Sequence, residues 1–409
     1  VADVMDAVRF AQSQGLPVSV RGGGHHVSGG SVIDQGLVID LSLMRSVRVD
    51  ATAGTVRAEG GATIGEVDRE THALGLAVPF GLVSATGVAG LTLAGGMGWL
   101  RRLHGLSSDN LLSADVVTAA GQLVHASQAE NADLLWALRG GGWDLGVVTS
   151  FEYRAHPIDS EVMFVFTAYP MDQAKQVLAG FRAWAATCPE GASPILVFWS
   201  FPGGEPYPEA VWNKQFVGIA GPFAGPVEQG ERILQPLREL ATPMLDMSGP
   251  MSWTAVQKAF DEEYPNGRRY YWKSTYLREL SDAAVDELVA LGSSRPSPLS
   301  SVDVWLMGGA LGRTPPGGTA VSHREAPYLI GVESNWEDAT EDSVNVAWTR
   351  AATAALAPYS TGGSYLNFED MNETGVAAAS HGAGFQRLVA VKKKFDPGNL
   401  FRSRAGLSG

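Results

Sequence analysis

Three glycine-rich segments lie within the first 150 residues of this chain, each beside an apolar run with the pattern of a β-strand. Residues 21–30 contain three consecutive glycines followed by His25 and His26, and residues 81–98 and 140–142 contain the other two glycine clusters. Glycine lets the backbone bend sharply and bring its N–H groups close to a ligand, typically a phosphate. Three such loops predict one ligand site built from several backbone segments. For residues 21–30 alone, a surface turn with two solvated histidines is the alternative.

Charge and composition exclude several classes of protein. The chain has 30 basic and 43 acidic residues, a net charge of −13, and a single basic cluster at 392–394 that fits a solvated helix face. The only cysteine, Cys188, excludes an internal disulfide and a cysteine-based metal cage. No apolar run approaches the roughly 20 residues of a membrane span, and no secretion signal is visible. We therefore expect a cytoplasmic protein without nucleic-acid or membrane partners, although the helical pattern at Val1 leaves open a lost upstream segment.

The first 157 residues alternate helical and strand patterns. Helices are expected at 1–15, 63–74 and 133–138, and strands at 17–21, 37–40, 44–49, 55–59, 111–118, 122–126 and 146–149. In the second helix, Glu66, Asp68 and Glu70 are placed on the outer face. Residues 81–100 are nearly uncharged, which predicts burial against something large that is not protein.

The pattern changes after Pro157, as expected for a chain too long for one hydrophobic core. Strands are expected at 163–168, 194–201, 216–221, 302–307 and 327–332, and helices at 173–186, 227–240, 283–291 and 343–356. This predicts an antiparallel sheet covered by helices, with most tryptophans in its core and one or two lining a pocket. The last fifty residues predict a strand at 364–368, a helix at 385–395 and a turn at 396–399.

Several short motifs occur in one order along the chain. They are Arg21-Gly-Gly-Gly-His25, the segment from Gly87 to Gly96, Gly105-Leu-Ser-Ser-Asp109-Asn110, Ala137-Leu-Arg-Gly-Gly-Gly142, Tyr365-x-Asn367 and Lys394-Phe-Asp-Pro-x-Asn-Leu-Phe401. The ordered set resembles, essentially from end to end, the berberine-bridge-enzyme-like branch of the vanillyl-alcohol-oxidase flavoproteins. A dinucleotide fingerprint at residues 140–146 is discounted, because it precedes a strand where that fingerprint follows one.

The resemblance implies an α+β fold with three parts. Residues 1–157 correspond to a PCMH-type FAD-binding domain of two α/β subdomains, and residues 158–360 to a substrate-binding domain with an antiparallel sheet covered by helices. Residues 361–409 correspond to a C-terminal, berberine-bridge-enzyme-like segment that returns to the FAD domain. The family's usual first strand is absent before Val1.

The resemblance also implies how FAD is held. His25 occupies the family's covalent attachment point on the flavin methyl group, but the neighbouring His26 keeps the choice between the two histidines open, with His25 favoured. Some relatives form a second bond through a cysteine; Val83 stands there, so a single bond is expected. A metal site at the two histidines lacks a third ligand. The other residues expected to bind the cofactor are Arg21, Gly22, Gly23, Gly24, Thr86, Gly87, Gly90, Leu91, Thr92, Gly95, Gly96, Asp109, Asn110, Val147 and Asn367.

Tyr365 is the candidate base. It lies two residues from Asn367 on an expected strand, so both side chains face the same way, and in the family the first residue of this motif points at the reactive face of the flavin. A core tyrosine with a satisfied hydroxyl is the alternative. A tyrosine base requires its pKa, ordinarily about 10, to fall, and one cation about 4 Å away suffices.

The sequence offers several groups that would act on Tyr365. Lys273, His323 and Arg324 are the candidate cations. Asp303 is a candidate either to accept the proton of the tyrosine or to orient it, because oligosaccharide-oxidising relatives use a tyrosine–aspartate pair.

The expected function is an FAD-dependent oxidase. Hydride passes from a small-molecule alcohol, sugar or secondary metabolite to covalent FAD, and O2 reoxidises the flavin with release of H2O2. The alternatives are an amine oxidase of the hydroxynicotine-oxidase type, a dehydrogenase with another electron acceptor, and a non-catalytic flavin-binding protein. The substrate and the oligomeric state stay open.

Overall fold

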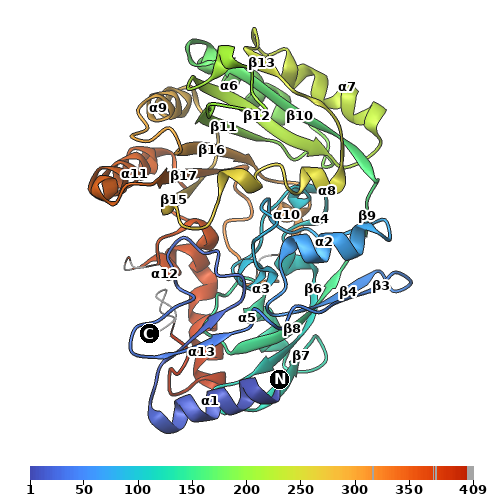
Figure 1. The fold of residues 1–409 in the computed structure, drawn as a ribbon, viewed down its shortest axis with the longest axis vertical. Coiled ribbons are helices and arrows are strands. Elements are labelled where there is room, and N and C mark those ends of the chain that lie inside the picture. The colour runs from blue at the N-terminus through green and yellow to red at the C-terminus, as the bar shows by residue number, and fades with distance from the viewer. Residues whose placement is uncertain (316, 372, 374, 403–409) are drawn as a thin grey trace.

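Two antiparallel sheets organise the chain in the computed structural model, which describes residues 1–315, 317–371, 373 and 375–402. The lower sheet in Figure 1 has five strands in the order β3-β4-β8-β6-β7, and the upper sheet has eight, in the order β13-β10-β12-β11-β16-β17-β15 with β14 paired to β10. A parallel pair, β1-β2, and a short antiparallel pair, β5-β9, lie outside them. The expected α+β class is confirmed.

The lower half is built from the first 157 residues, drawn in blue and teal in Figure 1. Its helices are α1 (Ala2–Gln14), α2 (Ile64–His72), α3 (Val88–Leu93), α4 (Arg101–His104) and α5 (Ala132–Leu138). Its strands are β1 (Val18–Arg21), β2 (Leu37–Asp40), β3 (Val47–Asp50), β4 (Thr55–Glu59), β5 (Leu76–Ala77), β6 (Leu111–Val117), β7 (Leu123–Ala126), β8 (Val147–Arg154) and β9 (His156–Pro157). Buried side chains of β4, β6, β8 and α5 form one core cluster.

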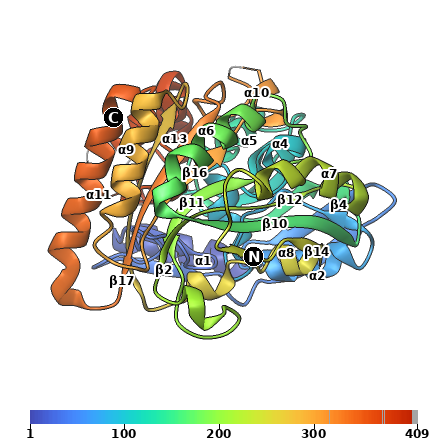
Figure 2. The same ribbon diagram turned by 90° about the horizontal axis from the view of Figure 1, so that it is seen from above.

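The upper half uses residues 161–356. Its strands are β10 (Glu161–Pro170), β11 (Ile195–Ser200), β12 (Gln215–Phe223), β13 (Leu245–Asp246), β14 (Gly249–Ser252), β15 (Arg269–Leu277), β16 (Ser301–Leu306) and β17 (Tyr328–Trp336). Its helices are α6 (Ala174–Ala185), α7 (Val227–Arg238), α8 (Trp253–Val256), α9 (Asp282–Ser293), α10 (Ala310–Arg313) and α11 (Asp342–Leu356). Helices α6, α7, α9 and α11 cover the outer face of the sheet (Figure 1 and Figure 2).

Strand alternation decides which side chains of the upper sheet can meet a ligand. On β16, Val302, Val304 and Leu306 pack into the core cluster beneath the helices. Because successive side chains point to opposite faces, Asp303 and Trp305 face the lower half of the molecule. Trp305 accordingly joins a second core cluster, shared with the lower half.

The C-terminal segment returns to the lower half. Helices α12 (Val376–His381) and α13 (Phe385–Phe395), red in Figure 1, run down beside α5, and residues 400–402 bond to β1. The ammonium of Lys392 is buried between the carboxylate of Asp396, at 2.6 Å, and two backbone carbonyls. Throughout the described ranges, every helix is too short or too polar to cross a bilayer.

Four expectations about local structure need correction. Residues 364–368 are not a strand: Tyr365 is extended and Leu366–Phe368 form a single 3-10 turn. The nine-residue strand β15 was missed. Asp68 is buried at 3% exposure rather than on the outer face of α2. Residues 81–100 are buried only in part against protein: Trp99 and its neighbours pack on the inner face of the upper sheet, whereas several residues of 81–91 line the cavity described below.

Candidate functional site

A cavity lies where the glycine-rich segments of the lower half meet the inner face of the upper sheet and the C-terminal segment. It encloses about 1380 Å³ of empty space, including its open mouth. The lower half contributes residues from 18–31, 81–91 and 97, together with Trp143 and Asp144. The upper sheet and the C-terminal segment contribute Tyr264, Trp272, Trp305, Glu333, Tyr365, Asn367, Phe368, Met371 and Phe401. The first two glycine segments therefore share one site, as the sequence predicted, whereas the third, residues 140–142, does not line it and only its neighbours Trp143 and Asp144 do.

These two segments touch each other backbone to backbone. A Cβ atom added to Gly23 would lie 2.4 Å from the nitrogen of Gly87, and one added to Gly87 would lie 2.3 Å from the nitrogen of Gly23. Gly24 has a φ of +66°, in the region that favours glycine. Because no side chain stands between the segments, this end of the cavity is lined by backbone, which suits a phosphate-bearing ligand.

The two adjacent histidines lie differently in the cavity wall. The ring nitrogens of His26 contact the hydroxyl of Ser28 at 2.8 Å and the carbonyl of Leu366 at 3.3 Å, and its ring meets Trp143 edge to face. The imidazole of His25 makes no hydrogen bond to another described residue. Burial lowers the pKa of both, that of His26 to about 4, so both rings are neutral. His25 therefore presents a neutral imidazole to the cavity, whereas His26 is held by protein groups.

The phenol of Tyr365 is held at its oxygen by two N–H donors. The backbone of Gly96 and the amide of Asn367 each donate to it, at 3.0 Å. Burial raises the pKa of Tyr365 to about 12, while these two donors act in the opposite direction because they stabilise the phenolate. The side chains of Tyr365 and Asn367 lie together as predicted, although a tight turn and not a strand brings them together.

None of the three candidate cations contacts this oxygen among the described residues. Lys273 pairs with Glu373 at 2.6 Å, Arg324 pairs with Asp109 at 2.6 Å, and the ring of His323 stacks on that of Tyr276. The cation expected beside the phenol is therefore replaced by two neutral donors.

A pair of buried carboxyl groups stands on the upper sheet. Asp303 does not line the cavity; its buried side chain is close enough to that of Glu333, which does line it, for the two to affect each other's pKa, and its Oδ1 has no hydrogen-bond partner among the described residues. Glu333 also accepts a hydrogen bond from the hydroxyl of Tyr264 at 2.9 Å. Burial raises the pKa of Asp303 to about 7, and burial together with Asp303 raises the pKa of Glu333 well above its usual value. Two carboxyl groups buried near each other titrate as a pair, since both cannot ionise cheaply.

Sequence reasoning missed both Glu333 and Tyr264. The signal for Glu333 was present, because it is the single charged residue in the buried strand Tyr328–Trp336. A charge inside an apolar strand pattern is costly unless it is paired, and such a residue is often functional.

Aromatic rings form the wall between the two acidic groups and the lower half. The ring of Phe368 meets Tyr365, Trp272 and Trp305 at centroid distances of 5.1, 5.7 and 5.6 Å. Tyr264 meets Trp272 edge to face. This wall suits a flat or ring-shaped ligand.

Seven residues expected at the cofactor surround the cavity without lining it. Arg21 pairs with Asp40 on the surface, and Asp109 pairs with Arg324. Thr92 forms a hydrogen bond with Tyr153, and Asn110 forms hydrogen bonds with two backbone carbonyls. Gly95 and Gly96 contact Tyr365, and Val147 lies in the core. His25, Gly22, Gly23, Gly24, Thr86, Gly87, Gly90, Leu91 and Asn367 do line it.

The residues of the cavity fit FAD. Its lining combines glycine backbone without side chains, apolar side chains, aromatic rings, titratable groups and the neutral imidazole of His25. These are the surfaces that the phosphates, the dimethylbenzene edge and the reactive ring of a flavin nucleotide require.

Comparison with known proteins agrees with this fit. The family described as FAD binding domain matches residues 1–127, and the family described as berberine and berberine like matches residues 364–408. An uncharacterised FAD-linked oxidoreductase of Bacillus subtilis, YgaK, is 30% identical over 98% of this chain and 87% of its own. The (R)-6-hydroxynicotine oxidase of Paenarthrobacter nicotinovorans is 30% identical over 98% of this chain and 87% of its own.

A solved structure has the same fold. That of 6-hydroxy-D-nicotine oxidase from Arthrobacter nicotinovorans superposes with a TM-score of 0.86 at 26% identity, covering 100% of this chain and 90% of that one. The family resemblance of the ordered motifs is confirmed. The chain is an enzyme and belongs to the berberine-bridge-enzyme-like family of FAD-linked oxidoreductases.

Proposed function

We propose that this enzyme oxidises a small-molecule alcohol or sugar, with FAD attached through one covalent bond to His25 and with O2 as the electron acceptor. Bound FAD supplies the hydride acceptor. In this proposal residues 1–157 and 361–409 hold the cofactor, and residues 158–360 hold the substrate. The observation that carries it is that His25, Tyr365 and Glu333 line the same cavity.

The surroundings of the two histidines favour His25 as the attachment point. A neutral imidazole with an available nitrogen is the nucleophilic form of histidine. Both ring nitrogens of His26 are engaged by Ser28 and Leu366, so attachment there would cost two contacts. Val83 lines the cavity and Cys188 lies in the upper half, which supports a single bond.

The cost of ionisation favours the carboxyl pair over Tyr365 as the group that takes the substrate's hydroxyl proton. A phenol with a pKa of about 12 acting as a base at pH 8 must overcome about 4 units, on the order of 5 kcal/mol. The Asp303–Glu333 pair requires less, because burial raises the pKa of Asp303 only to about 7, so near neutral pH the pair can carry one negative charge and one proton. We assign proton acceptance to Glu333, with Asp303 sharing the charge.

Tyr365 then orients the substrate oxygen by a hydrogen bond. Its phenolic oxygen already accepts from Gly96 and Asn367, so its own O–H is left to donate into the cavity. As negative charge builds on the substrate oxygen, this donor stabilises it.

A second candidate, oxidation of an amine, has one observation in its favour. Glu333 stands among the aromatic rings of Tyr264, Trp272 and Trp305, and a carboxylate with aromatic faces is the surface that binds an organic cation. An amine bound there as a cation transfers its proton to Glu333 before oxidation, and the neutral amine needs no further base.

The test is anaerobic flavin reduction with separate panels of alcohols, sugars and amines, followed by admission of air and a peroxide assay. Bleaching by an alcohol or sugar with one peroxide per flavin is expected. Bleaching by amines alone selects the second candidate. Slow reoxidation in air without peroxide overturns the oxidase assignment, and an absence of bleaching by all three panels overturns the proposal.

A further inference from the structure

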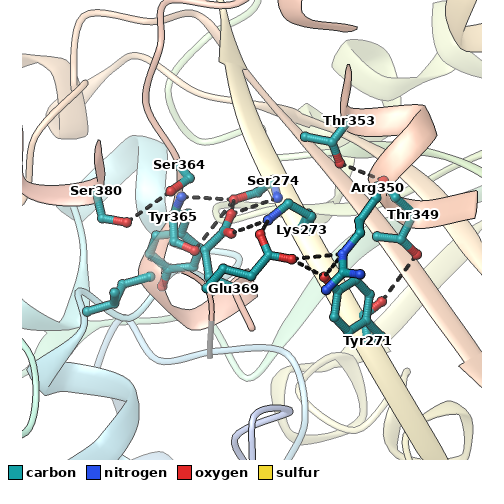
Figure 3. Close-up of polar contacts among 12 residues, drawn as sticks. Tyr271, Lys273, Ser274, Thr349, Arg350, Thr353, Ser364, Tyr365, Glu369 and Ser380 are labelled. Atoms are coloured by element: carbon teal, nitrogen blue, oxygen red, sulfur yellow. Dashed lines mark hydrogen bonds and ion pairs between the residues drawn. The ribbon is translucent and has the colours of Figure 1, made fainter. Parts of the chain in front are cut away.

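The turn that carries Tyr365 is fastened to strand β15 by one serine and one buried carboxylate (Figure 3). The backbone N–H of Tyr365 donates to Oγ of Ser274 at 2.8 Å. The same hydroxyl donates to Oε1 of Glu369 at 2.9 Å, and the backbone N–H of Ser274 donates to that oxygen at 2.9 Å. Glu369 therefore closes a ring that ties the start of the turn, at Tyr365, to its end.

Glu369 is almost fully buried, at 2% exposure. Lys273 is next to Ser274 on β15. Its ammonium lies 3.7 Å from Oε2 of Glu369 but 2.6 Å from Oε2 of Glu373, so it pairs more closely with Glu373 than with Glu369. Figure 3 shows these polar contacts as one continuous network. Tyr365, Ser274 and Glu369 form its inner part, and Lys273, Arg350 and Tyr271 its outer part. Burial accordingly raises the pKa of Glu369 to about 7.

A carboxyl group in such a place costs free energy that an apolar residue would not. The turn could be held to β15 by apolar contacts alone, since Phe368 already packs on Trp272. The carboxyl group adds hydrogen bonds, which are directional. They fix the position of the Tyr365 backbone, whereas apolar contacts alone would allow it to shift along β15. The tyrosine is then held at both ends, at its N–H by Ser274 and at its hydroxyl by Gly96 and Asn367.

We propose that Glu369 is a positioning residue for the oxidation, which acts through Ser274 to fix the backbone of Tyr365 and so to set where the phenolic hydroxyl meets the substrate. The inference rests on the proposed role of Tyr365. Reactions of this kind are sensitive to small errors of placement, and a shift of about 1 Å can cost on the order of a hundredfold in rate.

The test uses the holoenzyme and four variants. E369A removes the acceptor, and S274A removes the hydroxyl between Glu369 and Tyr365. E369Q keeps an acceptor oxygen for both Ser274 bonds. E373Q is the matched control. Glu373 contacts Lys273, Tyr271 and Arg350 in the outer part of the network, and these contacts do not include Ser274 or Tyr365.

Two readouts are needed, one of them independent of turnover. In crystal structures of E369A and S274A, the separation of the Tyr365 oxygen from the Gly96 nitrogen should lengthen from 3.0 Å to beyond about 3.5 Å, where the hydrogen bond is lost. In stopped-flow reduction by whichever substrate bleaches the wild-type flavin, both variants should lose at least about tenfold in the limiting rate, with the substrate Kd changed less than about threefold. E369Q and E373Q should stay within about threefold of wild type.

The inference fails if E369A and S274A keep both the 3.0 Å separation and the wild-type rate, or if E373Q loses as much as E369A. Should E369A not fold, S274A carries the same test, since it removes a single oxygen. Wild-type reduction by Y365F would instead refute the proposed role of Tyr365, and the crystallographic distance would still decide whether Glu369 positions it.

Discussion

The phenolic oxygen of Tyr365 lies 3.0 Å from the backbone nitrogen of Gly96, so a side chain of the C-terminal segment rests on a glycine-rich loop 269 positions earlier. A Cβ on Gly95 would meet the ring of Tyr365 at 3.2 Å, and both glycines have positive φ. These glycines, expected to hold the cofactor, instead contact Tyr365, which lines the cavity. The lower half and the C-terminal segment thus complete one site together.

Replacement of Tyr365 by phenylalanine removes the hydroxyl and leaves the ring packing on Phe368. We expect the limiting rate of flavin reduction to fall about 10- to 100-fold, the usual effect of losing one hydrogen bond to a charged oxygen. Stopped-flow reduction measures it. Tyr359→Phe, on the far side of β15, is the control, and an equal loss there would point to a general effect on the fold.

Replacement of Glu333 by glutamine removes the proposed proton acceptor. The limiting rate should fall at least about 100-fold with alcohol substrates. In the wild type the rate should rise with pH as the carboxyl pair ionises, because the carboxylate is the active form. That rise should be absent in E333Q, and a pH profile that survives the substitution would contradict the assignment.

Replacement of Asp303 by asparagine tests the coupling of the two acids. Asp303 raises the pKa of Glu333, so without its charge Glu333 ionises at lower pH. The rising limb of the pH–rate profile should therefore move to lower pH in D303N, with catalysis retained. A limb that stays in place would show that the two groups titrate independently.

The two histidines give a paired test of the attachment. In His25→Ala, acid precipitation should leave all the flavin in the supernatant, whereas His26→Ala should keep the yellow colour in the pellet. The measurement is flavin absorbance in both fractions. Colour retained in the pellet of the His25 variant would place the bond elsewhere.

Asp68 predicts a pH-dependent stability. Gln257 donates to it at 3.1 Å, but its Oδ1 has no partner among the described residues, and burial raises its pKa to about 7 against about 3.9 in an unfolded chain. Between pH 4 and 7 the folded state holds a proton that the unfolded state has released. The free energy of unfolding therefore falls as pH rises through this window.

Asp68→Asn removes that cost. Its Tm should exceed that of the wild type by at least about 2 °C at pH 8, with little difference near pH 4.5. Glu70→Gln, an exposed position on the same helix, should change neither value. A D68N variant that is less stable than wild type at pH 8 would show that Asp68 is ionised at no net cost.

The local patterns predicted most helices and strands, and the exceptions have physical causes. Asp68 fits the pattern of polar residues in α2 that predicts an exposed face. In the structure α8 of the upper half packs over it and its partner is Gln257, 189 residues away, which the local sequence pattern does not predict. The expected strand at Tyr365 failed because Ser274 and Glu369 fold the segment into a turn.

The sequence by itself determined the glycine-rich frame, the order of the motifs and the imidazole beside the cavity, because these depend on residues close together in the chain. Only the tertiary structure decided that Glu333 and Asp303 are buried near each other, that two neutral donors hold the phenol of Tyr365, and that Asp109 pairs with Arg324. Such pairings follow from strand order and from the meeting of distant segments. They change the pKa of each group through burial and neighbouring charge, which a linear sequence does not contain.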